Sequence, residues 1–206
     1  MSKQIILASA SPSRKRLLES VGITPQIKVS GVDEETPELL GLKPADLVIA
    51  LAILKAHTVY KNNPNLKETL IIGCDSTFEF EGENMGKPLT RASAIERCQT
   101  LSGNSGYLHT GHCVIDTDQG IEVSDISTSK VTFAKMSESE IIDYVDSGEP
   151  LEVAGGFTLD GRSAPFITHI EGDPSGIIGL SLPTLRKITM NLGLEWSAVA
   201  PVRSHS

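Results

Sequence analysis

The chain has 206 residues, 39% of them hydrophobic, and can bury one sizeable core, so we expect a single domain over residues 1–206, with or without a small lobe. Its formal net charge of −8 argues against nucleic acid polymers and membrane surfaces as partners, because both bind basic faces. It has no apolar run long enough to cross a bilayer and no signal-peptide pattern, which predicts a cytoplasmic protein.

An apolar strand leads directly into a helix near the start of the chain. Residues 5–7 have the apolar character of a strand. Ser11 before Pro12 is typical of a helix N-cap followed by proline in the first turn, and Gly22 ends the helix. The sequence therefore predicts a helix N-terminus directly after a strand, where free backbone N–H groups can bind phosphate.

Hydroxyl and basic side chains gather at this helix start. Ser9 and Ser11 precede the helix, and Arg14, Lys15 and Arg16 follow in its first turns. These groups could converge on one anion. A solvated first turn is an equally good interpretation of the spacing, because cations belong more naturally at a helix C-terminus.

Strand and helix signals alternate in the first half of the chain, and strand signals dominate later, without internal repeats. This order predicts a mixed α/β fold. After the first helix we expect an acidic loop over 29–38, a helix from Pro44 to about 62, strands over 70–73 and 77–80, and a helix from Thr90 to Gly103. Further on we expect strands over 107–116 and 121–133, a helix capped by Ser137 and Glu140 and ending near Gly148, a strand-rich stretch over 153–170, a helix from Pro183 and a frayed tail from Trp196.

Two acidic positions are candidates for metal binding or proton transfer. Asp75 follows the buried-type strand over 70–73, and open α/β sheets bind their ligands at the carboxyl ends of strands. A single Asp in this position is more often a turn former. Glu34 lies between Asp33 and Glu35, in a loop whose simplest interpretation is a solvated acidic surface.

Two lysines are candidates for binding an anion. Lys55 lies one turn beyond Leu51 on a helix with apolar neighbours, which would hold its ammonium toward the covered side; snorkelling to the helix edge explains the position equally well. Lys87 is held in place by its neighbours Gly86 and Pro88. A second positive charge near the acidic candidates would suit a polyphosphate, although such a lysine alone is typical of a surface.

Two other motifs have weaker implications. His109, His112 and Cys113 suggest a metal site, but strand alternation sends residues three apart to opposite faces, so we expect no common site. The three cysteines are widely spaced and include no Cys-x-x-Cys pair, which predicts reduced thiols. The glycine-rich stretch 172–181 lacks the Lys-Ser/Thr ending of a P-loop and is either a ligand-contacting loop or an ordinary tight loop.

Seven short motifs occur together in one order along the chain. They are Leu-Ala-Ser-Ala-Ser-Pro-Ser-Arg over 7–14 with Leu17 and Leu18, Val-Asp-Glu over 32–34, Lys-Ala at 55–56, Gly-Cys-Asp over 73–75, Gly-Lys-Pro over 86–88, Ala-Gly-Gly-Phe over 154–157 and Ile-Gly-Leu over 178–180. In this combination the chain resembles the Maf family, nucleoside triphosphate pyrophosphatases of the inosine triphosphate pyrophosphatase superfamily, from about residue 5 to 192. The resemblance implies an elongated α/β fold of two lobes around a central cleft, a divalent metal (Mg²⁺ or Mn²⁺) and frequently a homodimer.

The resemblance also implies a role for particular residues. The expected reaction is hydrolysis between the α and β phosphates of a nucleoside triphosphate, which needs an aimed water, a carboxylate to take its proton and cations on the leaving pyrophosphate. If the carboxylate only ligates the metal, the base would be solvent or another carboxylate. The residues so assigned are Ser9, Arg14, Lys55 and Lys87 for the triphosphate, Glu34 and Asp75 for the metal, and Asp75 as the proton acceptor.

At three positions the chain departs from the better-known subgroups of that family. Pyrimidine-type members tend to have Arg, Thr and Gln there, and methyl-GTP-type members Trp, Gln and Glu; this chain has Ser13, Ser76 and Asp160. Neither specificity is therefore carried over. The two serines would leave room around the base, and Asp160 could accept hydrogen bonds from an N–H face such as that of guanine or a modified nucleotide.

Two other functions remain as alternatives. One is a nucleotide-responsive binding protein in the control of septum formation, with little catalysis, and the other is a generic phosphatase. The presence of both carboxylates and both lysines favours an enzyme, because a pure binder has no need of a metal-held water. We therefore expect a hydrolase of acid anhydrides with a house-cleaning role on noncanonical nucleotides.

Overall fold

The computed structural model describes residues 3–200, and their core is a seven-stranded mixed sheet. The strand order is β2-β1-β3-β5-β6-β7, with β4 paired to β3. β1 is parallel to β2 and β3, and the remaining pairs are antiparallel. The strands are β1 (Gln4–Leu7), β2 (Gln26–Ile27), β3 (Thr69–Phe80), β4 (Glu83–Met85), β5 (Ser105–Asp116), β6 (Ile121–Phe133) and β7 (Ile167–Glu171). The mixed α/β fold expected from the sequence is confirmed.

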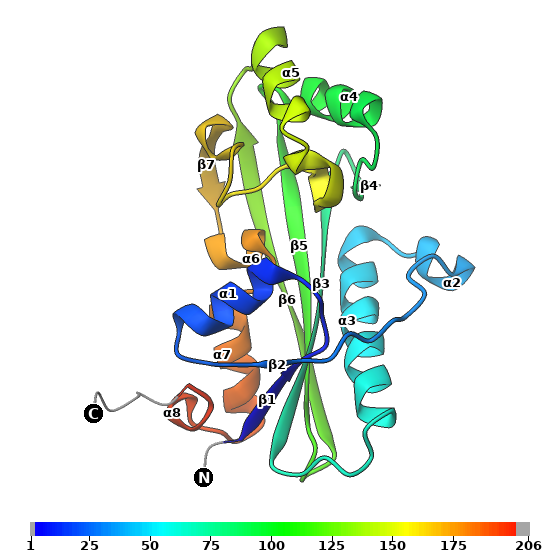
Figure 1. The fold of residues 1–206 in the computed structure, drawn as a ribbon, viewed down its shortest axis with the longest axis vertical. Coiled ribbons are helices and arrows are strands. Elements are labelled where there is room, and N and C mark those ends of the chain that lie inside the picture. The colour runs from blue at the N-terminus through cyan, green and yellow to red at the C-terminus, as the bar shows by residue number, and fades with distance from the viewer. Residues whose placement is uncertain (1–2, 201–206) are drawn as a thin grey trace.

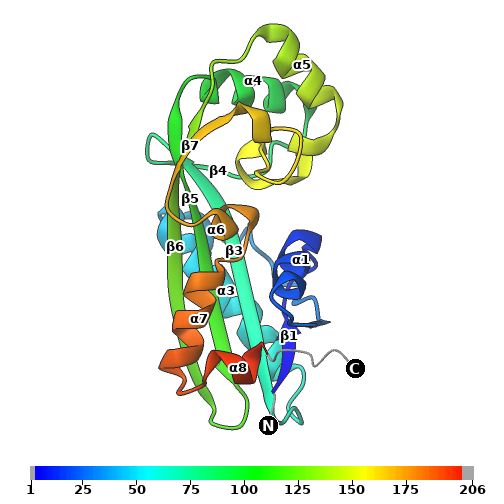
Figure 2. The same cartoon turned by 90° about the vertical axis from the view of Figure 1, so that its left-hand side faces the viewer.

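Helices cover different parts of this sheet. They are α1 (Pro12–Ser20), α2 (Pro37–Leu40), α3 (Pro44–Lys61), α4 (Arg91–Leu101), α5 (Glu138–Asp146), α6 (Pro174–Ile178), α7 (Leu182–Asn191) and α8 (Trp196–Val199), with short 3₁₀ turns η1 (Glu149–Glu152), η2 (Ala154–Gly156) and η3 (Ala164–Phe166). The molecule is elongated along β3, β5 and β6 (Figure 1). In the lower half of the molecule α3 lies on one face of these strands and α7 on the other, with α6 above α7 near mid-height, whereas α4 and α5 lie at the opposite end (Figure 2). We call the part of the molecule around α3 and α7 the lower end and the part around α4 and α5 the upper end.

The buried side chains form separate clusters that follow this division. At the lower end, strand alternation sends Ile72 to the side of α7 and Ile71 to the side of α3. At the upper end, Phe78, Phe133 and Phe157 pack edge to face, with ring centroids 5.0 to 6.0 Å apart. The long strands thus carry one apolar cluster on each side below and an aromatic cluster above, with more polar residues between them.

The structure corrects three expectations about the elements. β3 is continuous, so Asp75 lies in the middle of a strand and not at its end. The stretch over 153–170 is extended in a strand only from Ile167, where β7 begins; before it the chain forms the short 3₁₀ turns η2 and η3 and irregular bends, and Gly155 and Gly156, both with a φ of +72°, interrupt extended backbone. The chain from Trp196 folds as α8 and buries Val199, so the expected fraying does not begin there; residues 201–206 lie outside the described part.

Several local predictions are confirmed. Ser11 caps α1, Thr90 caps α4, and Ser137 forms a capping box with Glu140 at α5. All three cysteines are free and buried. Over residues 3–200, no helix combines the length and apolarity needed to cross a membrane.

Candidate active site

One stretch of β3 has an open edge at the centre of the molecule. β1 pairs with β3 only as far as Leu7 opposite Ile72, and β4 begins to pair only at Phe78. Over residues 73–77, within the described chain, β3 therefore pairs with β5 alone. The chain leaving β1 turns into α1 beside this open edge, which places the N-terminus of α1 against the middle of β3 (Figure 1).

Arg14 on α1 reaches three separate segments at this edge. Its Nε donates to the Gly179 carbonyl at 2.8 Å, and one terminal nitrogen donates to Ser9 Oγ at 3.0 Å and to the Cys74 carbonyl at 2.8 Å. The other terminal nitrogen donates to Ser76 Oγ at 3.1 Å. All these acceptors are uncharged, and no carboxylate among residues 3–200 forms an ion pair with Arg14. A half-buried guanidinium without a counter-charge is suited to bind an anion, so this position is a candidate anion site.

The rest of the predicted basic cluster does not join Arg14. Lys15 forms an ion pair with Glu19 at 3.5 Å on the exposed side of α1. Arg16 donates to Asp160 at 3.2 Å, away from the Arg14 contacts. The interpretation in which three basic residues converge on one anion is therefore wrong, because consecutive residues of a helix point in different directions.

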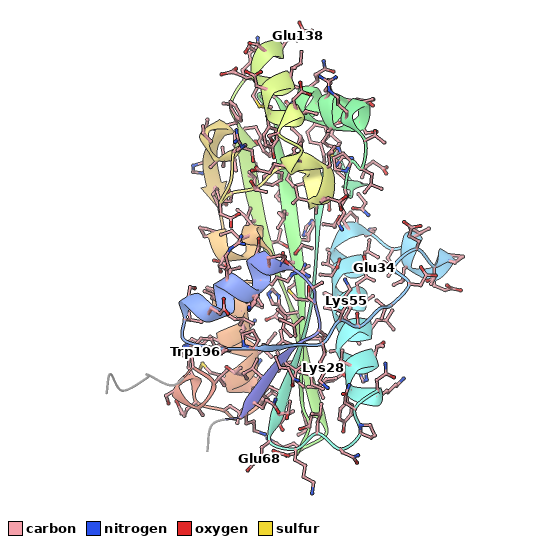
Figure 3. The ribbon with its side chains drawn as sticks, viewed as in Figure 1. Lys28, Glu34, Lys55, Glu68, Glu138 and Trp196 are labelled. Atoms are coloured by element: carbon pink, nitrogen blue, oxygen red, sulfur yellow. The ribbon has the colours of Figure 1, made fainter. Side chains whose placement is uncertain are left out.

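Lys55 joins two carboxylates from different parts of the chain. Its Nζ lies 2.6 Å from Asp75 Oδ1 and 2.6 Å from Glu34 Oε1. The side chains of Lys55 and Asp75 are 9% and 13% exposed, whereas that of Glu34 is 51% exposed. Figure 3 shows Lys55 on α3 and Glu34 on the loop that passes in front of it. The lysine is thus held toward the covered side, as one of its two interpretations predicted, and the cluster has one positive and two negative charges.

Two glycines explain how α3 comes close enough to place this lysine. A Cβ on Gly73 would lie 2.1 Å from the Ala52 carbonyl oxygen, and a Cβ on Gly111 would lie 2.2 Å from that of Val48. The backbone of α3 therefore packs directly on β3 and β5. Since Gly111 is the β5 partner of Asp75, the close approach occurs beside the carboxylate that Lys55 binds.

The two carboxylates fit a metal ion whose coordination is completed by phosphate oxygens of a bound substrate and by water. Mg²⁺ is usually held by one or two carboxylates together with phosphate oxygens and water. Glu34 and Asp75 supply two such groups around one point, which suits Mg²⁺ or Mn²⁺ bound with a polyphosphate. Over the described residues there is no group of three or more His, Cys, Asp or Glu placed to hold a metal, so the donor set does not fit a closed structural site.

The remaining predicted residues lie around this centre in different ways. Lys87 follows β4 and is exposed, and within residues 3–200 it forms no ion pair with the two carboxylates. Ser76 bonds Thr110 at 2.9 Å besides Arg14. Within the described chain, the side chains of Ser13 and Asp160 form a hydrogen bond with neither Arg14 nor Thr110. Both accept a hydrogen bond from the same terminal nitrogen of Arg16. The structure thus joins the predicted residues in three groups, around Arg14, Lys55 and Arg16, and Lys87 belongs to none of them among the described residues.

The two histidines do not share a site, as strand alternation predicted. His109 lies between Thr128 and Glu79, at 2.9 and 3.0 Å from its ring nitrogens. His112 is buried on the other face, where its Nε2 accepts the N–H of Ser181 at 2.8 Å. Burial, together with the nearby positive charge of Arg14, lowers the pKa of His112 to about 4. This histidine is therefore neutral at physiological pH.

Some functional contacts have no signal in the sequence. The carbonyls of Cys74 and Gly179 hold Arg14, and backbone acceptors of this kind cannot be recognised from residue type. The Cys74 thiol itself donates to the same Gly179 carbonyl, at 3.2 Å. Burial raises the pKa of this thiol to about 11, so Cys74 supports the site and is not a nucleophile. The glycine-rich stretch 172–181 contributes to the site through the backbone of Gly179.

Comparisons with known proteins agree on one family. Residues 4–192 match the family model described as Maf-like protein. The chain is similar to a nucleoside triphosphate pyrophosphatase of Streptomyces coelicolor, with 47% identity over 191 residues that cover 93% of this chain and 91% of the relative. Proteins of the same name from Salinispora tropica and Nostoc punctiforme are each 46% identical, over 93% and 92% of this chain and 84% and 94% of their own.

Proposed function

The chain belongs to the Maf-like proteins, and we propose that it is a nucleoside triphosphate pyrophosphatase that converts its substrate to a nucleoside monophosphate and pyrophosphate. It is thus a hydrolase acting on an acid anhydride. The observation that carries the proposal is that a positively charged group and a negatively charged group both lie at the open edge of β3. On one side of β3 Arg14 has a positive charge that no carboxylate among the described residues balances, and on the other side Asp75 and Glu34 hold more negative charge than Lys55 balances.

In this proposal residues at the N-terminus of α1 bind the phosphates. Arg14 supplies its charge, Ser9 ahead of the helix its hydroxyl, and Ser13 its backbone N–H, since Pro12 has no N–H and that of Arg14 is bonded to Ser11 Oγ. Each of these groups is fixed by contacts with β3 or α1 before a ligand arrives, so little reorganisation is needed on binding. Lys55 and, from the upper end, Lys87 complete the positive charge around the triphosphate.

Asp75 is the proposed proton acceptor. A water oxygen attacks the α phosphorus, the bond from that phosphorus to the α–β bridging oxygen breaks, and pyrophosphate leaves with the electron pair. The proton of the attacking water goes to the carboxylate of Asp75, which Lys55 keeps oriented at 2.6 Å. Lys55 thus has a second role as a positioning residue for the base.

A divalent cation fits this arrangement through Glu34 and Asp75. When bound, Mg²⁺ or Mn²⁺ supplies positive charge against the phosphate oxygens and lowers the pKa of a bound water. The exposed Glu34 side chain comes from a loop and the buried Asp75 side chain from a strand. We propose that Glu34 adjusts to the cation while Asp75 stays fixed.

Product analysis tests this function most directly. Wild type and Asp75→Asn would be incubated with ordinary and modified nucleoside triphosphates and with Mg²⁺ or Mn²⁺. We expect monophosphate plus pyrophosphate from the wild type and a rate at least about a hundredfold lower from the variant, because general base catalysis is lost. Asp146→Asn is the matched control, since Asp146 is an exposed carboxylate at the upper end whose side chain binds only Arg91 within the described part of the chain.

Other outcomes would identify a different function. Release of orthophosphate in place of pyrophosphate would make the protein a phosphatase. Nucleotide binding without turnover would favour the nucleotide-responsive binding protein over the enzyme. We propose noncanonical or modified nucleotides as the substrates, the cytoplasm as the location and a homodimer as the assembly; sedimentation would show the assembly directly.

A further inference from the structure

An ion pair joins the lower and upper ends of the molecule next to the proposed site. Arg16 on α1 donates to Asp160 Oδ2 at 3.2 Å from the same nitrogen that donates to Ser13 Oγ at 2.9 Å. Asp160 lies between η2 and η3 at the upper end, 144 residues away in the chain. The Arg16 and Asp160 side chains are 61% and 37% exposed, so both are accessible to a ligand.

The segment that carries Asp160 is fixed directly above the phosphate site. Phe157, three residues before Asp160, packs edge to face on Phe78 of β3, with centroids 5.2 Å apart. Phe78 lies on the same face of β3 as Ser76, which bonds Arg14. Going up β3, the anion site at Arg14 is therefore followed at once by the region that the ion pair spans. A nucleotide that binds with its phosphates at Arg14 and extends toward the upper end would have its base in that region.

We propose that Arg16 is a specificity-determining residue that, together with Asp160, reads the edge of the base. The proposal rests on the pyrophosphatase function proposed above. The pair offers guanidinium N–H donors from Arg16 beside Oδ1 of Asp160, which has no hydrogen-bond partner among the described residues. Such a neutral pair accepts bases whose edge carries both a carbonyl and an N–H group, because each finds its complement.

Each member of the pair alone would have a one-sided preference. Asp160 without Arg16 is an acceptor only, so it favours bases with amino groups and disfavours carbonyl oxygens. Arg16 without Asp160 is a donor only, so it favours carbonyl oxygens. Exposed ion pairs stabilise a fold little, and removal of either partner should leave the protein folded.

Three purine nucleotides that share the 6-carbonyl and differ at position 2 of the base test this inference, XTP alone also carrying a hydrogen on N3. GTP has an amino group there, ITP a hydrogen and XTP a carbonyl. The measured quantity is the ratio of kcat/KM for GTP to that for XTP, with ITP as the intermediate case. We expect Arg16→Met to raise this ratio about tenfold and Asp160→Ala to lower it about tenfold. Shifts in opposite directions are the signature of a shared donor and acceptor pair.

Lys15→Met is the matched control, because it removes the same charge from the same helix at a side chain that pairs with Glu19 on the exposed side. Its ratio should equal that of the wild type. Inhibition by tripolyphosphate should stay within about twofold of wild type in all three variants, since the phosphate contacts are unchanged. The inference is overturned if Arg16→Met behaves like Lys15→Met, or if Arg16→Met and Asp160→Ala shift the ratio in the same direction.

Failure of the proposed function would be recognised separately. If the wild type released no pyrophosphate from any nucleotide, the ratio of the dissociation constants for the same nucleotides would be measured by calorimetry. Opposite shifts of that ratio in the two variants would support base recognition by Arg16 in a binding protein. If both variants kept the wild-type ratio of dissociation constants, base recognition by Arg16 would be overturned.

Discussion

At the scale of single residues, the site contrasts two cations with different partners. Arg14 donates its hydrogen bonds to carbonyl and hydroxyl oxygens, so its positive charge is not neutralised by a carboxylate of the described residues. Lys55 is bound by the two carboxylates of Glu34 and Asp75 and acts mainly on them. The planar guanidinium suits the first role, because it donates in several fixed directions, and the compact ammonium suits the second.

This contrast predicts that Arg14 cannot be replaced by lysine. A single ammonium cannot reach Gly179, Cys74 and Ser76 together, so Arg14→Lys would leave the cation unfixed. We expect kcat/KM for pyrophosphate release to fall about a hundredfold, equivalent to about 3 kcal/mol of transition-state stabilisation. Arg91→Lys, at an exposed ion pair of the upper end, is the control. An Arg14→Lys enzyme with wild-type kinetics would contradict this account of the anion site.

A second residue-scale prediction concerns His112 and pH. Burial and the charge of Arg14 lower its pKa to about 4, whereas an unfolded histidine titrates near 6.5. A backbone hydrogen bond with Thr110 and the nearby carboxylates of Asp125 and Asp173 raise the pKa of His112 but do not outweigh burial and Arg14. Between these two values only the unfolded state takes up the proton, so the folded state loses stability as the pH falls from 6.5 toward 4.

We expect the free energy of unfolding of the wild type to drop by about 2 kcal/mol more between pH 7.5 and pH 5 than that of His112→Gln. Glutamine can still accept the N–H of Ser181 but does not titrate. Urea denaturation at the two pH values measures the difference. If the free energy of unfolding fell equally in both proteins, His112 would not be the titrating group.

At the scale of secondary-structure elements, the site depends on how closely α3 approaches β3 and β5. Gly73 and Gly111 allow backbone-to-backbone contact, which sets the height of Lys55 above Asp75. The helix itself is anchored by small buried residues such as Ala52 and Ala56. The geometry of the ion pair is therefore a property of the packed elements as much as of its own residues.

Gly111→Ala tests this dependence. The added methyl group would meet the Val48 carbonyl at 2.2 Å and push α3 away from the sheet. We expect a loss of unfolding free energy of about 3 kcal/mol, together with reduced turnover because Lys55 moves with the helix. Gly41→Ala is the matched control, since its methyl group would make only an ordinary contact at 3.6 Å. Equal stability of the two variants in urea denaturation would contradict the close packing.

The sequence predicts elements best where local chemistry decides them. The caps of α1 and α5 were predicted from Ser11 and from Ser137 with Glu140, because capping is a local interaction. The end of the strand before Asp75 was predicted wrongly, since pairing with β5 carries β3 on to Phe80. The backbone acceptor at Gly179 could not be predicted at all, because it depends on tertiary packing.

At the scale of the whole molecule, three long strands connect the two ends. β3, β5 and β6 run through both and leave no interruption where the ends could separate (Figure 2). The upper end is fixed to them through Phe157 on Phe78, and the lower end through α3 and α7. Trp196, the single tryptophan, lies at the lower end (Figure 3). This architecture predicts that residues 3–200 unfold as one unit.

Phe157→Ala tests that prediction across the length of the molecule. Removing a large aromatic side chain from the upper cluster should lower the free energy of unfolding by about 3 kcal/mol or more. The transition followed by Trp196 fluorescence at the lower end should shift as much as the one followed by circular dichroism. Met190→Ala, at an exposed side chain of α7, should shift neither. If Phe157→Ala left the transition followed by Trp196 fluorescence unchanged, the two ends would unfold as separate units.

The alternation of side chains along β3 limits how a chain with this site can change in length. Asp75 points toward Lys55 on α3, and its neighbour Ser76 points toward Arg14 on the other side. Inserting one residue before them would put the Asp75 carboxylate in the place where Ser76 faces Arg14, and deleting one would put the Ser76 hydroxyl in the place where Asp75 faces Lys55. We therefore expect a chain with this site to tolerate changes of length in the connections, such as 62–68 and 117–120, and only substitutions in β3.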